Sequence, residues 1–272
     1  MSTVQREFAG TRPLTVITHS ALLTGRLLRT LRRMPTFLVV GLVQPVIWLL
    51  LFGQLFRSVV NLPGFTLGSG GFLQFLTPGV VMMTALFASA WAGTTYLQDI
   101  DRGVMDRLLT SPAGRGAMMC ATMAYQALQT VIQSLVIVVI ALIAGARFPG
   151  GVVGIGVTVL AAVLLALIFS ALSNAVALLT RQQATLIAIS QFTTLPLMFL
   201  SSAVMDLRVA PSWVGRVAAY NPVEWAVVAA RRAMLVPADW STVWARLGLL
   251  AVAVLVMGFL ATRAFRAYRK SA

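Results

Sequence analysis

Charged side chains of both signs are concentrated in one short stretch of this chain, 99–115, between two long apolar segments. The stretch holds three of the seven carboxylates in the sequence. Its charged residues are Asp99, Asp101, Arg102, Asp106, Arg107 and Arg115. Because charge inside a bilayer is costly, such a cluster has little reason to exist unless a molecule outside the membrane binds it. The spacing therefore predicts a docking surface beside a membrane.

The residue types that catalysis or metal binding would need are sparse. One His and one Cys are too few to form a metal site. His19 is a poor catalytic base near the amino terminus, and Lys270 follows no glycine-rich phosphate-binding loop. The apolar segments have no Asp, Glu, Lys or Arg at mid-span, so no charged side chain is available there for a proton relay. We therefore expect no enzyme and no bound cofactor, and any energy for uphill movement of a solute must come from another subunit.

Apolar segments dominate the rest of the chain. Hydrophobic residues make up 59% of the sequence and the mean hydropathy is +0.89, which exceeds the needs of a soluble core. A helix of about 20 residues covers the hydrocarbon thickness of a bilayer. The sequence therefore predicts an all-α integral membrane protein with six transmembrane helices, at 36–57, 77–97, 118–144, 152–179, 184–205 and 244–264. Charged residues interrupt 206–243, which excludes a seventh span.

Basic residues predict the orientation of the spans. Segments 1–35 and 98–117, Arg181 and the tail from Arg263 contain 14 Arg and Lys residues, against 7 on the other side. Because Lys and Arg favour cytoplasmic loops, we expect both termini in the cytoplasm of a cell-membrane protein. The net charge of +14 is placed to meet anionic lipid headgroups, so no nucleic-acid partner is expected. The predicted parts are a cytoplasmic segment 1–35, a membrane domain 36–264 and a basic tail 265–272.

A basic amphipathic helix is predicted ahead of the first span. Apolar residues from Leu14 to Leu31 share one face of a helical wheel. The opposite face contains His19, Arg26, Arg29 and Arg33. This pattern is typical of a helix that lies in the membrane surface, and Pro35 ends it. Two interpretations stay open: the helix anchors the first span, or it also contacts a cytoplasmic partner beside the charged stretch.

Polar and small residues inside the spans follow helical spacing. Three glutamines lie on one side of the third span, where hydrogen bonding between helices is the default explanation. They are Gln126, Gln129 and Gln133. Small residues on the second span permit either a close helix pair or a dimer seam. They are Ala85, Ser89 and Gly93.

A mixed polar and polarizable face is predicted on the fifth span. Ordinary packing would explain this face, and so would a wall for a bulky apolar solute, because Met and Phe adapt to many shapes. The first span adds a polar residue beside Pro45, which should kink that helix. The predicted solute path comprises Gln44, Phe87, Gln191, Thr194, Met198 and Met205.

Three ordered motifs extend along nearly the whole chain. One is the stretch 195–205 followed by Pro211-Ser-Trp213, Asn221-Pro222 and Arg231. Another runs from Asp101-Arg-Gly103 to Pro112, and the third is Arg32-Arg-Met-Pro35 followed by Gln44-Pro45. Together they resemble the membrane subunits of type-2 ABC exporters, especially daunorubicin-resistance-like drug exporters. Asp206 stands where that family commonly has proline, and its usual loop glutamates are aspartates here.

The resemblance implies a fold and a role for several residues. It implies an amino-terminal connecting helix, a coupling helix between spans two and three, and re-entrant outer helices in 206–243. The coupling residues would be Asp99, Asp101, Arg102, Gly103, Asp106, Arg107, Leu108 and Pro112. The connecting helix would include His19, Arg26, Arg29 and Arg33. The outer re-entrant residues would be Pro211, Trp213, Asn221, Pro222 and Arg231.

The resemblance also implies partners. A second permease subunit, identical or paralogous, would pair with this chain above two ATPase subunits that bind ATP and Mg. Spans one, two and five would line a cavity at the dimer interface. A hydrophobic or amphipathic solute, such as a drug, an antibiotic or a lipid-like molecule, would leave the cell by alternating access.

Two other functions fit the sequence less well. A proton-coupled multidrug carrier would need a carboxylate inside a span and an internal repeat, and the sequence has neither. A lipid-handling or lipid-modifying membrane protein without an ATPase partner would need a polar cluster facing one leaflet, which is also missing from the sequence. The sequence therefore favours the permease.

Overall fold

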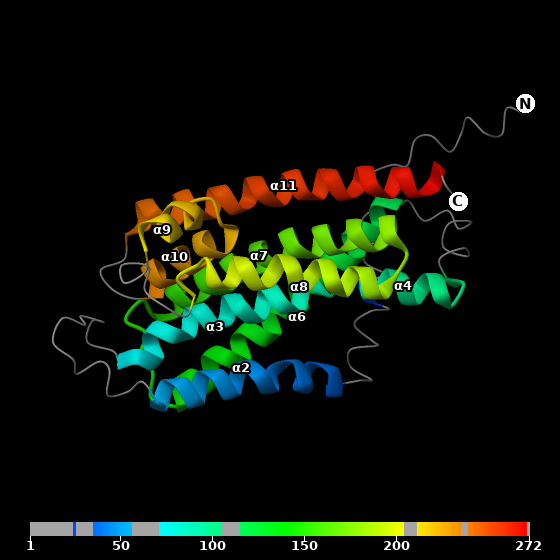
Figure 1. The fold of residues 1–272 in the computed structure, drawn as a ribbon. Helices are drawn as coiled ribbons and strands as arrows, with labels where there is room; N and C mark the ends of the chain where they lie inside the picture. The colour runs from blue at the N-terminus through cyan, green and yellow to red at the C-terminus, as the bar shows by residue number, and fades with distance from the viewer. Residues whose placement is uncertain are drawn as a thin grey trace, which may run out of the picture.

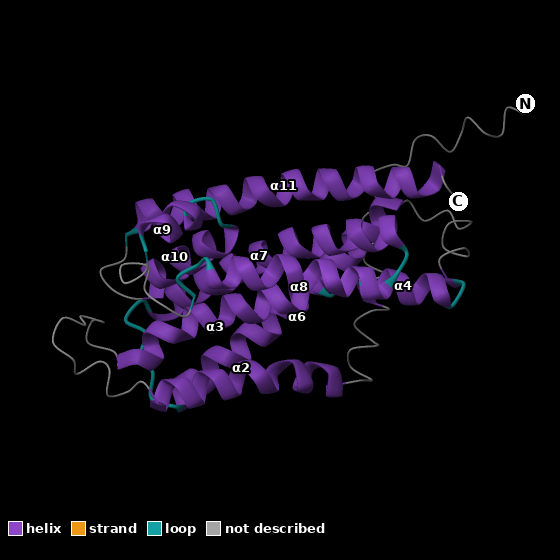
Figure 2. Cartoon of the chain, viewed as in Figure 1, coloured by secondary structure: helices purple, strands orange, loops and turns teal. Residues whose placement is uncertain are grey.

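Helices make up the regular structure of the part of the chain that the structure describes. The computed structural model describes residues 24–25, 35–55, 71–104, 115–203, 211–234 and 239–270. No strand occurs within those ranges, as Figure 2 shows. The helices in Figure 1 are α2 (Pro35–Leu55), α3 (Gly71–Ala90), α4 (Thr94–Asp101), α6 (Arg115–Ile143), α7 (Gly151–Thr180), α8 (Gln183–Phe199), α9 (Ser212–Ala218), α10 (Pro222–Met234) and α11 (Trp240–Lys270). The predicted all-α class is confirmed.

Several of these helices have the length and composition of membrane spans. Among the described residues, four helical segments are long and apolar enough to cross a bilayer. They are Gly71–Asp101, Met118–Ile143, Gly151–Thr180 and Trp240–Arg263. The apolar part of α2, Val39–Leu55, is shorter, and α8 has 17 residues. The chain is thus a multi-span helical protein, while the count of six spans stays a prediction.

Some helix ends differ from those expected. α3 begins at Gly71, ahead of the span start predicted at 77, and Gln74 and Thr77 are buried within its first turns. The Thr77 hydroxyl donates to the Leu73 carbonyl at 2.7 Å, which satisfies it inside the helix. α8 ends at Phe199, and α9 and α10 lie within 206–243. Hydropathy depends on the type of a side chain and not on its burial, so helix ends predicted from hydropathy can be displaced by several residues.

The centre of the bundle is α7. It packs against α3, α6, α10 and α11, and more lightly against α4 and α8. Its covered face is rich in alanine, including Ala161, Ala162, Ala166 and Ala171. Small side chains let helices approach closely, and in a bilayer this packing replaces the hydrophobic effect as the attraction between helices. α2 packs mainly on α3 and α6 and lies at the edge of the bundle (Figure 1).

The long helices lie along a common axis and alternate in direction. In Figure 1, α2, α6 and α8 run one way, and α3, α7 and α11 run the other. Only two residues separate α7 from α8, and the first of them, Arg181, adopts a left-handed conformation with φ 53° that reverses the chain. α9 and α10 lie at one end of the bundle, and α4 projects from the opposite end (Figure 1).

A break between α3 and α4 directs α4 out of the bundle. The Ser173 hydroxyl of α7 donates to the Ala90 carbonyl at 2.7 Å and accepts from the Gly93 amide at 3.0 Å. The Ser190 hydroxyl of α8 donates to the same Ala90 carbonyl at 2.8 Å. A Cβ on Gly93 would lie 2.4 Å from the Ser173 carbonyl oxygen, so only glycine permits this approach. Two neighbouring helices therefore fix the direction of α4.

Candidate functional site

The coupling residues that the structure describes lie at the tip of α4. Asp99 is half-buried, whereas Asp101 and Arg102 are exposed. Gly103 has φ +65°, and its amide donates to the Ile100 carbonyl at 3.0 Å, which closes the end of the helix. The tip of α4 lies at one end of the bundle (Figure 1), so the exposed charges of Asp101 and Arg102 lie at that end. The other predicted coupling residues, Asp106, Arg107, Leu108 and Pro112, lie outside the described residues.

Little of the predicted connecting helix is described. His19, Arg26, Arg29 and Arg33 lie outside the described residues, as does Met205 of the predicted solute path. Thr24 is described, and its hydroxyl lies 3.5 Å from the Ala121 carbonyl of α6. This contact places the Thr24 segment against the first turns of α6.

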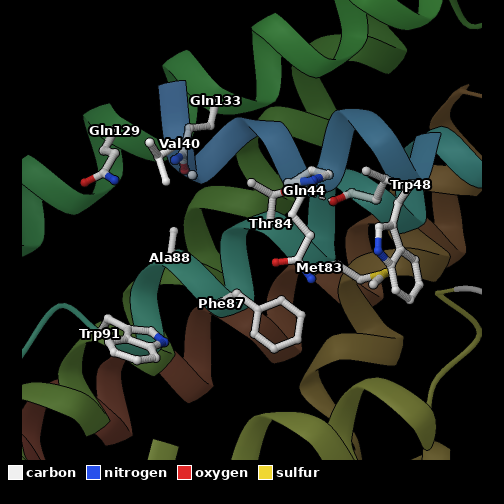
Figure 3. A pocket seen from close by; sticks show the side chains of 13 residues that line it. Val40, Gln44, Trp48, Met83, Thr84, Phe87, Ala88, Trp91, Gln129 and Gln133 are labelled. Atoms are coloured by element: carbon white, nitrogen blue, oxygen red, sulfur yellow. Dashed lines mark hydrogen bonds between the residues drawn. The ribbon is translucent and has the colours of Figure 1, made fainter. Parts of the chain in front are cut away.

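A cavity of about 250 Å³ lies between α2, α3 and α6 (Figure 3). It brings together two residues of the predicted solute path, Gln44 of α2 and Phe87 of α3. In Figure 3 the Gln44 side chain points from α2 toward Met83 and Phe87. The lining residues are Val40, Gly41, Gln44, Pro45, Trp48, Val80, Met83, Thr84, Phe87, Ala88, Trp91, Gln129 and Gln133.

The lining of this cavity is amphipathic and uncharged. Three of its side chains are glutamine amides, and none is Asp, Glu, Lys or Arg. Gln129 and Gln133 are 5% and 3% exposed, so their amides are held within the bundle. Among the described residues, Gln133 Oε1 has no hydrogen-bond partner. A buried carbonyl oxygen without a donor is costly, so Gln133 is held inside the bundle at the expense of one hydrogen bond.

The fifth-span residues of the predicted solute path lie elsewhere. Thr194 and Met198 are buried on the face of α8 that packs against the bundle, and the Thr194 hydroxyl donates to the Ser190 carbonyl at 2.8 Å. Gln191 is exposed on another face, beside Phe192, which is 84% exposed. One chain therefore does not bring these residues into the cavity that contains Gln44 and Phe87.

The outer motif joins α8 to α10 through Asn221. Its Nδ2 donates to the carbonyls of Leu197 and Leu200, at 2.7 and 2.8 Å, at the end of α8. Its Oδ1 accepts from the Val223 amide at 2.9 Å and so caps α10. Pro222 occupies the first position of that helix, where its fixed φ is suitable and no amide is needed. Asn-Pro is thus a junction between two helix ends.

Two charged residues of α10 strengthen the same junction. The Glu224 carboxylate accepts from the Ser202 amide at 2.6 Å, and Arg231 Nη2 donates to the Ser202 carbonyl at 2.6 Å. The Arg231 guanidinium also donates to the Phe75 carbonyl at 3.3 Å and lies 3.7 Å from the centre of the Phe75 ring. Sequence reasoning found Arg231 but missed Glu224, whose position three residues after Asn221 is that of a capping-box glutamate.

The remaining outer residues lie on or before α9. Pro211 immediately precedes the helix, and its carbonyl accepts from the Val214 amide at 2.9 Å. Trp213 is half-exposed on α9. Exposed tryptophan at the end of a membrane bundle is typical of the interface between headgroups and water.

The fold and the site define a polytopic helical membrane protein with an uncharged cavity and a charged projection at one end. Among the described residues, no group of three or more His, Cys, Asp or Glu side chains could hold a metal ion. Residues 19–235 match the model of the ABC-2 type transporter family, and the chain belongs to that family. The resemblance stated from the sequence motifs is confirmed.

Curated relatives agree with the family. A daunorubicin resistance ABC transporter permease, DrrB1 of Streptomyces coeruleorubidus, is 27% identical over 83% of this chain and 79% of its own length. The putative transport permease ycf38 of Cyanophora paradoxa is 29% identical over 75% of this chain and 70% of its own. A probable doxorubicin resistance permease, DrrC of Mycobacterium tuberculosis, is 22% identical over 79% of this chain and 76% of its own.

Proposed function

We propose that this chain is the membrane permease subunit of an ATP-driven exporter that moves a hydrophobic or amphipathic solute out of the cell. The observation on which the proposal rests is the family match over residues 19–235. Relatives named as drug-resistance permeases align with most of this chain and most of their own length, which supports export of a drug-like solute. The uncharged cavity between α2, α3 and α6 suits such a solute.

Energy comes from a separate ATPase subunit, bound in two copies, with ATP and Mg held there. The exposed charges of Asp101 and Arg102 at the tip of α4 support this arrangement, because mixed charge on a short projection suits a cleft in a partner protein. Closure of the ATPases moves this tip and switches the permease between inward and outward access. A second permease subunit completes the complex.

The proposed topology has six spans and both termini in the cytoplasm of the cell membrane. α2 and α8 serve as the first and fifth spans. The alternating directions in Figure 1 support it, as does the position of α9 and α10 at the end opposite to α4. The excess of basic residues in 1–35 and 98–117 supports the cytoplasmic assignment of the α4 end. α9 and α10 form the outer re-entrant segment.

The solute path runs through the dimer interface formed by the first, second and fifth spans. The exposed face of α8, with Gln191 and Phe192, supports a role in that interface. Thr194 and Met198 are buried on a different face of α8, which packs against the bundle. They contribute to the path by positioning α8 and do not line the cavity of a single chain.

Reconstituted transport tests this function. The chain and a co-purified ATPase subunit are placed in proteoliposomes, and uptake of daunorubicin is followed by its fluorescence. We expect uptake that requires hydrolysable ATP and persists when a protonophore removes the proton gradient. Uptake by the chain alone in response to an imposed pH gradient, in excess of the uptake by protein-free liposomes under the same gradient, would instead identify a proton-coupled carrier.

A further inference from the structure

We propose that Tyr96, Thr122 and Asn174 form a hydrogen-bonded switch that gives α4 two positions relative to α6 and α7. In the position that the structure shows, the Tyr96 hydroxyl of α4 donates to Thr122 of α6. In the other position it donates to Asn174 Oδ1 of α7. The three side chains are thereby positioning residues for ATP-driven transport. That role rests on the proposed function, whereas the two positions of α4 do not.

Side chains from three helices meet at the Thr122 hydroxyl. Its oxygen lies 3.2 Å from Tyr96 Oη and accepts from Asn174 Nδ2 at 3.4 Å. The Thr122 proton is directed to the Met119 carbonyl of its own helix, at 3.0 Å. Because a hydroxyl has one proton, Tyr96 is the donor in its contact with Thr122. Thr122 is therefore the acceptor that connects α4 and α7 to α6.

The Asn174 amide is satisfied at only one of its two ends. Asn174 is 0% exposed, and its Nδ2 lies 3.7 Å from the Met119 sulfur as well as donating to Thr122. Among the described residues, Asn174 Oδ1 has no hydrogen-bond partner. The opposite amide orientation would turn Oδ1 toward that sulfur, which has no proton, and toward a hydroxyl whose proton is already directed elsewhere. A buried acceptor without a donor is costly, so a rearrangement that brings a donor to Oδ1 is favoured.

The Tyr96 hydroxyl is the donor within reach of that acceptor. Tyr96 and Asn174 both contact Thr122, so their polar ends lie within two hydrogen-bond lengths of each other. When Tyr96 donates to Asn174 Oδ1 instead, Thr122 keeps its bonds to the Met119 carbonyl and to Asn174 Nδ2. The exchange therefore satisfies Oδ1 and leaves no further buried donor unpaired.

The packing around Tyr96 accommodates this movement. Tyr96 is 2% exposed, but it lies in a small cluster distinct from the main core of the bundle. Met118 and Met119 belong to that cluster, and Met123 and Met257 pack against it. Methionine side chains are flexible and adapt to changes of shape, unlike the closely packed alanines on the covered face of α7. The ring of Tyr96 can therefore shift without opening a cavity.

Distances between two spin labels, measured by double electron–electron resonance, test the two positions of α4. The labels are attached to Gln98→Cys on α4 and Leu255→Cys on α11, both at exposed positions, in the purified full-length chain after Cys120→Ser. The chain is held in lipid nanodiscs. Because α11 packs against α7, the pair reports movement of α4 relative to α7. We expect one major and one minor distance when the switch residues are unchanged.

Matched variants distinguish the switch from ordinary packing. Thr122→Val removes the acceptor that Tyr96 uses in the described position, so the ratio of minor to major distance should rise about three- to tenfold, the value of one hydrogen bond. Asn174→Leu removes the alternative acceptor and should lower the ratio. Thr130→Val is the control, because Thr130 is a buried threonine of α6 whose hydroxyl donates within its own helix, at 2.9 Å. It should change the ratio less than about twofold.

Three results would overturn the switch. Equal effects of Thr122→Val and Thr130→Val would do so, and so would a single distance in every variant. A shift by Thr122→Val that persists when Tyr96→Phe is added would also do so, because Phe has no proton to move. These outcomes do not depend on the proposed function, since no ATPase is present.

The role in transport is measured separately, in proteoliposomes that contain the permease with its ATPase. Asn174→Leu should lower transport per ATP hydrolysed at least about threefold, because one of the two positions loses its hydrogen bond. Unchanged transport per ATP in this variant would remove the switch from coupling. If the unmodified chain shows no ATP-driven uptake, the proposed function is wrong, and the distance measurements still decide whether α4 has two positions.

Discussion

Single residues hold together the end of the bundle that contains α9 and α10. Asn221 joins the last carbonyls of α8 to the first amides of α10, so one side chain serves two helix termini. Inside a membrane domain such terminal groups have few alternative partners, and leaving them unpaired is costly. The junction therefore depends on both ends of the Asn221 amide.

Substitution of Asn221 tests this dual role. Asn221→Ala should destabilise the protein by about 2 to 4 kcal/mol, because three backbone groups lose a partner. Asn221→Asp keeps the acceptor for the Val223 amide but turns a second oxygen toward the Leu197 and Leu200 carbonyls. It should therefore be at least as destabilising as Ala, as measured by thermal unfolding in detergent. An Asp variant with wild-type stability would mean that capping of α10 alone matters.

The sequence motif marked three residues of this junction, but it did not predict the junction itself. The Asn221-Pro222 pair and Arg231 stood out in the outer motif. Their partners are backbone groups of Ser202, Phe75 and the end of α8, which have no signature in the sequence. Glu224 was noted only as one of the charges that exclude a further span.

At the scale of elements, α7 and α10 approach each other closely where α7 has a glycine, which has no side chain. Gly154 of α7 lies against the end of α10, and a Cβ on it would be 2.4 Å from the Ala233 carbonyl oxygen. Gly156, one half-turn away on the same helix, has open space around the position of its Cβ. The two glycines are thus a natural pair for comparing packing with helix propensity.

Alanine at these two positions should have opposite effects. Gly154→Ala should destabilise the bundle by about 1 to 3 kcal/mol, because the backbone of α10 must move away. Gly156→Ala should be neutral or stabilise by up to about 1 kcal/mol through helix propensity. Thermal unfolding of the two variants side by side measures the difference. Equal effects would contradict the close approach of α7 and α10 at Gly154.

The break before α4 should transmit force between α4 and the spans. Ser173→Ala removes both hydrogen bonds that Ser173 makes at the break, so it should cost about 1 to 3 kcal/mol and lower transport per ATP hydrolysed. Ser190→Ala is the control, since the Ala90 carbonyl keeps its bond to Ser173. If both variants keep wild-type transport per ATP, the break has no part in coupling.

Element types were easier to predict than element limits. The small-residue pattern of Ala85, Ser89 and Gly93 indicated either a helix pair or a dimer seam, and the structure places Gly93 against Ser173 of α7 within one chain. The break at 91–93 was not foreseen, because its stabilising partners lie on α7 and α8. Contacts between residues 80 or more positions apart leave no local pattern.

At the scale of the whole molecule, the proposed topology places α4 and both termini on one side and α9 on the other. Single cysteines at Ser2, Ser271 and Ser212, made after replacing Cys120 by Ser, report the side of each position. We expect a membrane-impermeant thiol reagent to label intact cells at Ser212 alone. Labelling of Ser271 from outside would contradict the six-span model with cytoplasmic termini, and labelling of Ser271 without Ser2 would contradict an even number of spans.

The solute path could be predicted only in part from a single chain. Gln44 and Phe87 were grouped with the fifth-span residues because the resemblance places three spans at a common interface. In the single chain, the first two residues share a cavity while Thr194 and Met198 pack inward. A path between two protomers depends on contacts that neither the sequence nor one protomer specifies.

The central claim is that a separate ATPase drives this permease through the segment around α4. The most direct test is to measure transport per ATP hydrolysed by the Arg107→Glu variant. The measurement uses proteoliposomes containing the permease with its ATPase, and a detergent pull-down records association. We expect normal membrane insertion with transport reduced about tenfold or more, because reversing an interfacial charge opposes its partner. The ATPase should either dissociate or hydrolyse ATP without transport. Full transport together with full association would contradict the claim.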